Sequence, residues 1–265
     1  IGAGNMAGSL INGLIESGTA PREIAVADPV ATQLEKFSAL GVSAAASNDS
    51  AVEDADVVVL AVKPQVTGQV LTQLSGLKPH QLIISIVAGI DLRSLEAWLP
   101  EKQPIVRCMP NTPALLGAGM TGLFANKQVS HSQKDSATHI LSAVGEVAWV
   151  TKETHLDAVT ALSGSGPAYF FLLMENMILA GQKLGLDAEL SKKLTQQTAF
   201  GAALMAQNSD IDPGTLRKNV TSPGGTTEAA LNLMLNEGLP ATVIEALTAA
   251  ENRAKELAVE FGAKS

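Results

Sequence analysis

The chain opens with the stretch Ile1-Gly2-Ala3-Gly4-Asn5-Met6-Ala7, and this stretch decides the fold of its first half. Two glycines and a small residue at this spacing form a dinucleotide-binding turn between a strand and a helix. Gly2 allows the tight turn, Gly4 lets a pyrophosphate approach the backbone, and Ala7 lets the helix pack on the strand. The N–H groups at the start of the helix attract the phosphates. A glycine turn can also be purely structural, so the motif needs support from the neighbouring sequence.

The residues after this turn supply that support. Apolar residues recur at helical spacing, and residues 24–27 then form a short strand that Asp28 closes. Asp28 is about as far from the turn as the carboxylate that binds the ribose hydroxyls in such folds. A carboxylate there favours NAD and repels the 2′-phosphate of NADP, and no arginine follows it directly. The alternative is that Asp28 only begins a turn with Pro29.

Apolar runs typical of strands follow at residues 56–62, 82–87 and 105–109, with weaker signals at 122–125 and 147–150. Strands buried on both faces have this composition, which implies a parallel sheet covered by helices. The alternation of strands and helices predicts a doubly wound Rossmann fold of the α/β class for residues 1–151. Because the chain begins inside the glycine motif, we expect a few more native residues that complete the first strand.

Ligands bind at the carboxyl ends of the strands in a sheet of this kind. Two segments are therefore expected along the cofactor, namely Ala61-Val62-Lys63-Pro64 and Val87-Ala88-Gly89. Lys63 is placed to contact a phosphate or the ribose. The alternative is that it is a solvated lysine at a strand end.

After about Thr151 the strand signals stop and helical patterns continue to the end of the chain. They cover residues 156–162, 168–184, 190–207, 227–235 and 241–261. Several of these helices are apolar nearly all round, and such helices must be buried in a core or against a second subunit. A small bundle has little interior of its own, so we predict a helical domain over residues 152–265 and a homo-oligomer.

The composition excludes several classes of protein. The 265 residues carry a formal net charge of -8 with no basic run, which argues against a nucleic-acid partner. Polar residues interrupt the most apolar long stretch, 168–184, and no signal peptide is visible, so we expect no membrane span. Cys108 is the single cysteine, which excludes an internal disulfide and fits a reducing cytoplasm. The histidines are scattered without metal-ligand spacing, so we expect no metal site.

A glycine-rich loop before the helix expected at 227–235 is the candidate site for chemistry. It has the sequence Ser222-Pro223-Gly224-Gly225-Thr226-Thr227, whose N–H groups and hydroxyls can hold a carboxylate. The alternative is ordinary capping of the helix by serine or threonine. A second loop, Ser163-Gly164-Ser165-Gly166-Pro167, lacks the pattern of a nucleophile elbow. No acid–base pair stands out, which suits hydride transfer because the cofactor carries the difficult step.

The chain resembles pyrroline-5-carboxylate reductases over essentially its whole length. The resemblance is carried, in this order, by Ala61 to Pro64, Met109-Pro110-Asn111-Thr112-Pro113, Leu162 to Tyr169 and Thr221 to Thr227. It implies a Rossmann domain followed by an all-helical C-terminal dimerisation domain that intertwines with a partner subunit. It also implies the last step of proline biosynthesis, in which a hydride from the reduced form of NADP or NAD converts Δ1-pyrroline-5-carboxylate, a cyclic imine, to L-proline.

The resemblance further implies roles for individual residues. The loop of Ser222, Gly225, Thr226 and Thr227 would bind the substrate carboxylate. The Thr227 hydroxyl would hydrogen-bond the ring nitrogen, either as a proton donor or to orient the ring. The cofactor contacts carried over are Ile1, Gly2, Ala3, Gly4, Asn5, Met6, Asn48, Ala61, Val62, Lys63, Pro64, Glu153 and Asn219. Asp28 stands where other members have a small hydroxyl residue, which leaves the choice between NAD and NADP open. A dimer or a ring of dimers is the implied assembly.

Two other kinds of function stay open at this point. A β-hydroxyacid dehydrogenase or a general imine reductase has the same architecture, but such enzymes typically use a lysine early in the helical domain. This chain has Lys152 and then a Gly-Ser-Gly-Pro segment, and the loop at residues 222–227 argues against those enzymes. A non-catalytic dinucleotide sensor would keep the glycine turn without needing an anion-binding loop. Turnover separates an enzyme from a sensor.

Overall fold

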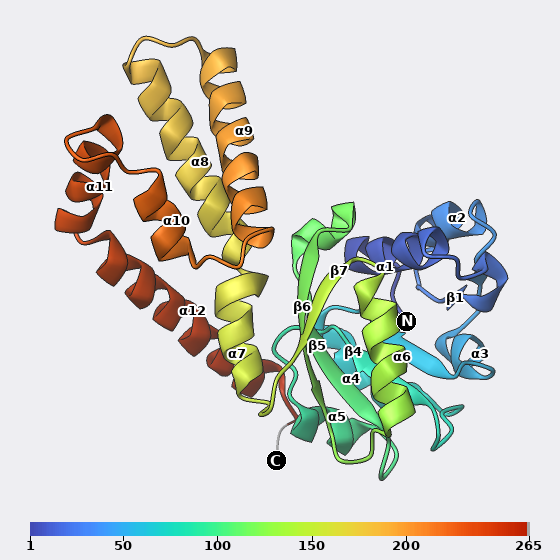
Figure 1. The fold of residues 1–265 in the computed structure, drawn as a ribbon. Helices are drawn as coiled ribbons and strands as arrows, with labels where there is room; N and C mark the ends of the chain where they lie inside the picture. Colours follow the sequence, from blue (N-terminus) through green and yellow to red (C-terminus); the bar gives the residue numbers. More distant parts are fainter. Residues whose placement is uncertain (264–265) are drawn as a thin grey trace. The chain divides into compact units, whose positions relative to one another are not determined.

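The computed structural model describes residues 1–263 of the chain. The chain divides into two compact units, of which the first is residues 1–165 with the chain from Ala249 onward and the second is Gly166–Thr248. The first unit contains the sheet, and the second consists of helices (Figure 1).

The opening residues join two hydrogen-bonded sheets in the first unit. The strands are β1 (Ala25–Val26) and β2 (Ser43–Ala44) in one sheet, and β3 (Val57–Leu60), β4 (Leu82–Ser85), β5 (Ile105–Met109), β6 (Gly119–Ala125) and β7 (Gly145–Trp149), in that order, in the other. The nitrogen of Ile1 donates to the carbonyl of Val59 at 2.7 Å. The N–H of Gly2 donates to the carbonyl of Ala27 at 2.8 Å. Residues 1 and 2 therefore lie between β1 and β3 and make the two sheets continuous.

Helices and helical turns connect these strands. In the first unit they are α1 (Asn5–Glu16), η1 (Pro21–Glu23), α2 (Ala31–Ser38), α3 (Asn48–Val52), α4 (Pro64–Gln73), α5 (Leu92–Trp98), η2 (Thr112–Leu116), α6 (His131–Ser142), α7 (His155–Val159) and the π-helical turn η3 (Thr160–Gly164). The helix expected over 156–162 is thus an α-helical turn that widens into a π-helical one. None of the helices in the described part of the chain has the length and apolarity to cross a membrane.

The sheet is parallel in its first part and mixed at its far edge. β3, β4 and β5 are parallel, with Ile83 opposite Ile105. β6 runs antiparallel to β5, with Cys108 opposite Leu123, and β7 runs parallel to β6. The predicted parallel sheet is therefore confirmed for β3 to β5, whereas β6 and β7 run in the opposite direction. The physical reason is the connection: η2 is too short for the crossover that a parallel neighbour of β5 would need.

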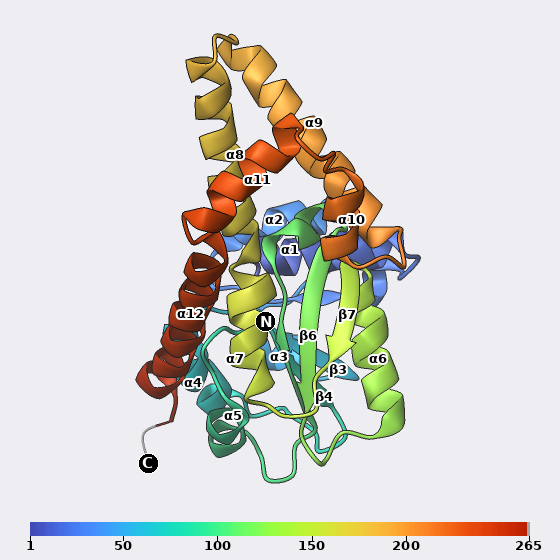
Figure 2. The ribbon, with the colours of Figure 1, turned by 60° about the vertical axis from the view of Figure 1, so that its left-hand side comes forward.

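Apolar layers fill both faces of this sheet, because alternate residues of a strand point to opposite faces. On one face, Leu60 and Ile83 pack with residues of α3, α4 and α5. On the other face, Ile84 and Val106 pack with residues of α1 and α6. Phe37 of α2 closes a third cluster over β1. Helices cover both faces (Figure 2), which is the predicted doubly wound arrangement.

The second unit contains α8 (Gly166–Lys183), α9 (Ala188–Gln207), α10 (Pro213–Asn219), α11 (Thr226–Asn236) and the first part of α12 (Leu239–Phe261). α8 and α9 form an antiparallel pair (Figure 1) joined at Gly185, which has φ +96°. α10 was not expected from the sequence. Asp212 caps it by accepting the N–H of Thr215 at 3.1 Å.

The last turns of α12 belong to the first unit. Phe261 packs against the core cluster that contains residues of α5. The N–H of Ala263 donates to Ser94 Oγ on α5 at 2.9 Å. The end of α12 and the residues up to Ala263 are therefore fixed to the sheet unit.

Candidate functional site

The glycine turn before α1 is closed on one side and open on the other. Gly2 has φ +94°, a left-handed conformation that favours glycine. A Cβ at Gly2 would lie 2.5 Å from the carbonyl oxygen of Ala61, so no side chain fits there. A Cβ at Gly4 would have no neighbour within 4 Å. The turn therefore has room for a ligand at Gly4 and none for a side chain at Gly2.

The start of α1 presents backbone donors to that open side. Gly4 stands directly before the helix and provides no side-chain cap. The N–H groups of Asn5, Met6 and Ala7 lie in the first turn, where a helix offers them no acceptor. Together with the helix dipole they form a site for an anion. The residues present thus fit the pyrophosphate of the dinucleotide that the fold implies.

Asp28 holds this turn from the side of β1. Its Oδ2 accepts the N–H of Ala3 at 2.8 Å, and its Oδ1 accepts the N–H of Val30 at 2.9 Å. The hydrogen bond to Val30 forms the local turn that was the alternative interpretation of Asp28. The hydrogen bond to Ala3 goes beyond that turn, because it connects the carboxylate to the glycine turn before α1. Asp28 therefore shapes the turn as well as beginning one of its own.

Backbone hydrogen bonds bring the other expected cofactor segments to the same edge of the sheet. The N–H of Ala61 donates to the carbonyl of Ile1 at 2.8 Å, and the N–H of Ile86 donates to the carbonyl of Leu60 at 3.1 Å. The glycine turn, the segment after β3 and the loop after β4 therefore follow three neighbouring strands. Carboxyl ends of neighbouring parallel strands are where such sheets bind ligands.

Several side chains of these segments are available for contact. Lys63 is exposed directly before α4, and Ala88 is exposed in the loop after β4. Val62 and Pro64 are half-buried. Asn48 is half-buried as the first residue of α3. The structure thus places these residues in the same unit as the glycine turn, and their contacts with a cofactor stay a prediction.

Glu153, implied as a cofactor residue, contacts protein groups in this structure. Its Oε1 accepts hydrogen bonds from Arg107 Nη1 at 2.9 Å and from the N–H of Leu92 at 2.6 Å. The side chain of Arg107 is 9% exposed and that of Glu153 is 27% exposed. This oxygen therefore binds groups within the first unit rather than a cofactor.

Burial shifts the pKa of two groups in the first unit. Burial raises the pKa of the Cys108 thiol, which is 2% exposed, so this cysteine is an unreactive residue of the core. Partial burial also raises the pKa of Asp157, and the nearby charges of Arg107 and Lys255 oppose that rise.

The second unit contains the loop predicted to bind the substrate carboxylate. α11 begins at Thr226, its N-cap is Gly225, and no side chain caps it. The first-turn N–H groups of Thr226, Thr227 and Glu228 therefore have no acceptor within the helix. Ser222, Thr226 and Thr227 are exposed. Capping by serine or threonine, the alternative reading of this loop, is not what the structure shows.

Two hydrogen bonds within the loop limit the donors that a ligand can use. The N–H of Gly225 donates to the carbonyl of Ser222 at 3.0 Å. The N–H of Gly224 donates to Glu228 Oε2 at 2.7 Å. The free donors are therefore in the first turn of α11 and on the neighbouring hydroxyls.

Asn219, implied as a cofactor residue, lies apart from the others along the chain. It is the exposed last residue of α10, in the second unit. The remaining implied cofactor residues all belong to the first unit. Its role toward a cofactor stays a prediction.

The contacts of Arg107 and Asn111 were not predicted from the sequence. Asn111 is 9% exposed, its Nδ2 donates to the carbonyl of Ser163 at 3.0 Å, and its Oδ1 accepts the N–H of Met120 at 2.9 Å. It thus connects two of the segments that carry the family resemblance, 109–113 and 162–169. A polar residue inside an apolar strand or loop was the only available signal, and it did not reveal the partner.

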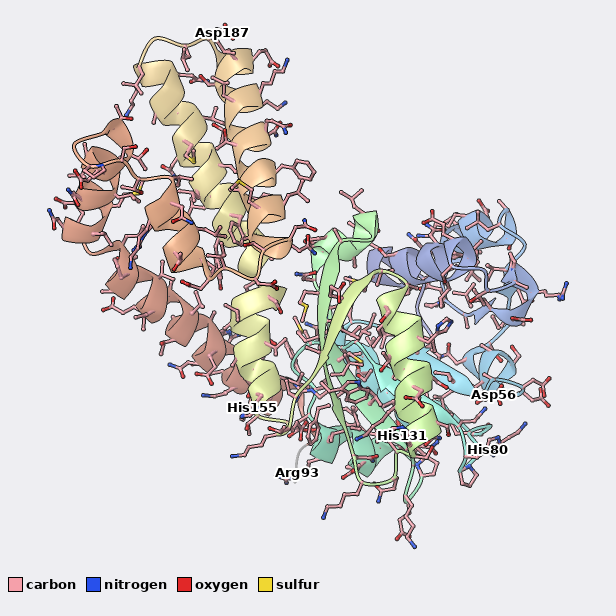
Figure 3. All side chains as sticks on the ribbon, viewed as in Figure 1. Asp56, His80, Arg93, His131, His155 and Asp187 are labelled. Atoms are coloured by element: carbon pink, nitrogen blue, oxygen red, sulfur yellow. The ribbon has the colours of Figure 1, made fainter. Side chains whose placement is uncertain are left out.

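The described residues offer no group of three or more His, Cys, Asp or Glu side chains that could hold a metal ion. Figure 3 labels three of the histidines, with His131 at the start of α6, His155 at the start of α7 and His80 in the segment before β4. All four histidines of the chain, His139 included, are exposed.

Known proteins match the chain along its whole length. A family model described as pyrroline-5-carboxylate reductase dimerisation matches residues 153–257, and one described as NADP oxidoreductase, coenzyme F420-dependent, matches residues 1–89. A pyrroline-5-carboxylate reductase of Pseudomonas aeruginosa is 54% identical over 99% of this chain and 97% of that protein. The structure of one from Coxiella burnetii has a TM-score of 0.92 at 45% identity, covering 97% of this chain and 96% of that one. The structure of one from Plasmodium falciparum with NADP bound has a TM-score of 0.85 at 33% identity and the same coverage.

These matches confirm the predicted fold class, with a dinucleotide-binding first half and a helical dimerisation part. They also decide between the families that the sequence left open, because the identity to a single curated relative is 54% over nearly the full length of both chains. The chain belongs to the pyrroline-5-carboxylate reductase family.

Proposed function

We propose that the two uncapped helix starts divide the work of the family's reaction. The chain is an NAD(P)H-dependent oxidoreductase that reduces Δ1-pyrroline-5-carboxylate to L-proline, the last step of proline biosynthesis. The start of α1 holds the cofactor, and the start of α11 holds the substrate carboxylate. The observation that carries this division is that α11 follows Gly225 with no side-chain cap, in an exposed loop rich in hydroxyls.

The substrate carboxylate is held at the first turn of α11. The N–H groups of Thr226, Thr227 and Glu228 are the donors, and the dipole of the helix favours a negative charge beside them. The hydroxyls of Ser222 and Thr226 add donors at the same place. Hydrogen bonds to a charged acceptor contribute about 1.5–3 kcal/mol each, so a few of them suffice for a small metabolite.

Thr227 is the proposed catalytic residue. It is the second residue of α11, and its side chain is exposed and does not cap the helix. A substrate whose carboxylate is bound at this turn carries its ring nitrogen a short distance away. The Thr227 hydroxyl then donates a hydrogen bond to the neutral imine nitrogen, or accepts one from that nitrogen when it is protonated, and in both cases orients the ring.

The reaction needs little more from the protein than correct placement. Bound reduced nicotinamide supplies the hydride that goes to the imine carbon. The imine nitrogen is basic enough to be protonated for part of the time near neutral pH, and the iminium is already electrophilic. Holding the reactants in the right geometry can then supply several orders of magnitude in rate.

We infer that Asp28 makes NADH the preferred cofactor of this chain. Both carboxylate oxygens accept backbone N–H groups, which fix the carboxylate at the end of β1. A 2′-phosphate near that charge is repelled. The next basic residue along the chain, Lys36, bonds to Gln33 Oε1 at 3.1 Å on the surface of α2.

We further propose that the second unit forms a homodimer and that dimers assemble into a ring. The family match over residues 153–257 is named for dimerisation. The helices of this unit expose large apolar side chains, with Phe170 at 65%, Phe171 at 62% and Leu172 at 60%. Contiguous apolar surface of this kind marks a protein interface. Light scattering of the full chain measures the number of subunits.

The same proposal includes the domain boundary and the cellular location of the protein. We place the domain boundary between residues 1–151 and 152–265, because the dimerisation match begins at residue 153. This domain is larger than the second compact unit, because it also includes residues 152–165 and the last turns of α12, which belong to the first unit. Limited proteolysis of the full chain tests this boundary.

We place the protein in the cytoplasm, because its single cysteine is buried and free. Cell fractionation tests the location.

The initial rate of NADH or NADPH oxidation with Δ1-pyrroline-5-carboxylate tests the activity. We expect oxidation that depends on the substrate, with L-proline formed in equal amount, and a higher kcat/KM with NADH. Protein that binds a reduced nicotinamide cofactor but does not oxidise it with this substrate would contradict the proposal. It would restore a dinucleotide sensor or another imine reductase as the best interpretation.

A further inference from the structure

The loop between β4 and α5 is held at its far end by a charged pair in the core. The loop spans residues 86–91 and contains the exposed Ala88, which we place at the cofactor. The next residue, Leu92, begins α5 and donates its N–H to Glu153 Oε1 at 2.6 Å. The same oxygen accepts a hydrogen bond from Arg107 Nη1 at 2.9 Å.

Arg107 is a fixed point of this arrangement because it lies within the sheet. It pairs with Ser85 of β4 on one side and with Phe124 of β6 on the other. Its side chain is 9% exposed, so its charge needs a partner, and Glu153 is the acid that contacts it. Glu153 lies between β7 and α7, so one carboxylate joins the middle of the sheet to the end of the β4–α5 loop.

The loop is also supported along the rest of its length. Gly89 has φ +71°, and a Cβ there would lie 3.1 Å from Cβ of Leu257, on the last turns of α12. Ile90 is fully buried, and Asp91 Oδ1 caps α5 by accepting the N–H of Ser94 at 2.8 Å. The loop is therefore fixed from behind, while Ala88 faces solvent.

We propose that Glu153 is a positioning residue that sets the 86–91 loop against the cofactor by holding the Leu92 N–H. Arg107 fixes the carboxylate that does so. The inference rests on the proposed function, since that function places the loop at the cofactor. A carboxylate whose only task was to neutralise Arg107 would have no need of the bond to Leu92. Substitutions can separate these two tasks.

Two variants separate the pairing with Arg107 from the hydrogen bond to Leu92. Glu153→Gln keeps an oxygen that can accept the Leu92 N–H but removes the charge that pairs with Arg107. The double variant Arg107→Met, Glu153→Leu removes both charges and fills the space with apolar side chains, which leaves the Leu92 N–H without its acceptor. We expect Tm to fall in the first variant and to recover toward wild type in the second. The affinity for NADH should instead stay near wild type in Glu153→Gln and fall in the double variant.

The measurements use the full chain and do not depend on turnover. In the double variant the Kd for NADH, from fluorescence titration, should rise about fivefold, as expected when part of one hydrogen bond to a charged acceptor is lost. Amides of residues 87–92 should also exchange faster with solvent in the cofactor-free protein. In Glu153→Gln the Kd should stay within about twofold of wild type.

Glu153→Asp provides a second test should the double variant fold poorly. It keeps a charge near Arg107 but withdraws the oxygen by one methylene, so the Kd for NADH should again rise about threefold or more while the KM for the substrate stays constant. Leu141→Ala, in the core cluster on the other face of the sheet, is the control for lost stability. It should lower Tm without changing the Kd for NADH.

Wild-type NADH affinity and wild-type exchange of residues 87–92 in both the double variant and Glu153→Asp would overturn the inference. Failure of the proposed function looks different. In that case wild-type protein would bind NADH without oxidising it with Δ1-pyrroline-5-carboxylate, and the binding and exchange comparison of the variants would still decide the role of Glu153.

Discussion

In the proposed function, the start of α1 and the start of α11 bind two different anions by the same means. Each follows a glycine that gives no side-chain cap, so the first-turn N–H groups stay free. In each turn, one backbone N–H of the turn donates to the side chain of an acidic residue. Asp28 takes that of Ala3, and Glu228 takes that of Gly224.

The two sites differ in how much of the protein supports them. The turn before α1 is packed against β3, with Ala3 fully buried and Gly2 against the backbone of Ala61. The turn before α11 is exposed, and a Cβ at Gly224 would meet nothing within 4 Å. Substitutions should therefore act through steric fit at the cofactor turn and through charge and hydroxyl groups at the substrate loop.

Gly2→Ala should have the largest effect, because it breaks the tightly packed turn. The added Cβ would lie 2.5 Å from the Ala61 carbonyl oxygen, in a left-handed conformation that disfavours alanine. We expect NADH affinity to fall by about a hundredfold or more. Gly8→Ala, inside α1, is the matched control. Its added Cβ would lie 3.7 Å from the Phe37 ring, which is an ordinary van der Waals distance. That variant should bind NADH normally, and equal binding by both variants would contradict the role of Gly2.

Thr227→Ala tests the hydroxyl at the open site. Loss of the hydrogen bond to the ring nitrogen should lower kcat by about tenfold to a hundredfold. The Kd for NADH should change by less than about twofold, because the substitution leaves the cofactor turn intact. Thr227→Ser keeps the hydroxyl and should recover most of the rate. Steady-state kinetics with unchanged kcat in Thr227→Ala would remove this residue from the mechanism.

Asp28→Ser removes the charge that stands beside the cofactor turn. We expect the ratio of kcat/KM for NADPH to that for NADH to rise about tenfold, because repulsion of the 2′-phosphate is lost. Asp28→Asn retains an acceptor for the Ala3 N–H and separates charge from shape. A ratio that moves in neither variant would show that Asp28 does not select the cofactor.

Glu228→Gln removes the corresponding charge at the substrate loop. The amide oxygen can still accept the Gly224 N–H, so the loop should keep its shape. Weaker repulsion of the substrate carboxylate should lower its KM by about twofold at low salt, and the gain should shrink at high salt. An increase in KM would mean that Glu228 helps to bind the substrate.

Asp157→Asn should have the smallest effect. Partial burial raises the pKa of Asp157, so the folded state holds its proton more tightly than the unfolded state does. Ionisation of Asp157 therefore costs stability as pH rises through its pKa, and this cost is absent in the variant. We expect the variant to be more stable at pH 7 by about 0.5 kcal/mol or less, since the group is partly solvated. Thermal unfolding at pH 7 and pH 4 should show the difference shrinking at the lower pH.

Local patterns predicted the parts of the molecule that depend on residues close in sequence. The glycine turn, the apolar strands and Asp28 at the end of β1 were all visible as spacing within a short stretch. The direction of β6 was not visible, because an apolar run has the same appearance in either direction. Only the short connection through η2 determines it.

Contacts between distant residues escaped the sequence analysis. Arg107 was visible only as one polar position in an apolar strand, and its partner Glu153 lies on the far side of β6, α6 and β7 in the chain. The interaction of Asn111 with Ser163 likewise joins residues that no periodic pattern relates. At α11, the spacing predicted an anion-binding loop, while the identification of Gly225 as the N-cap needed the backbone conformation.

Hydrogen exchange of the full chain tests the division between the two helix starts most directly. The protein would be compared alone, with NADH, and with NADH plus L-proline, whose carboxylate is that of the substrate. We predict that NADH slows exchange at residues 2–8 and that added L-proline slows exchange at residues 222–230. Protection by L-proline that leaves residues 222–230 unchanged would contradict the assignment of the substrate to the start of α11.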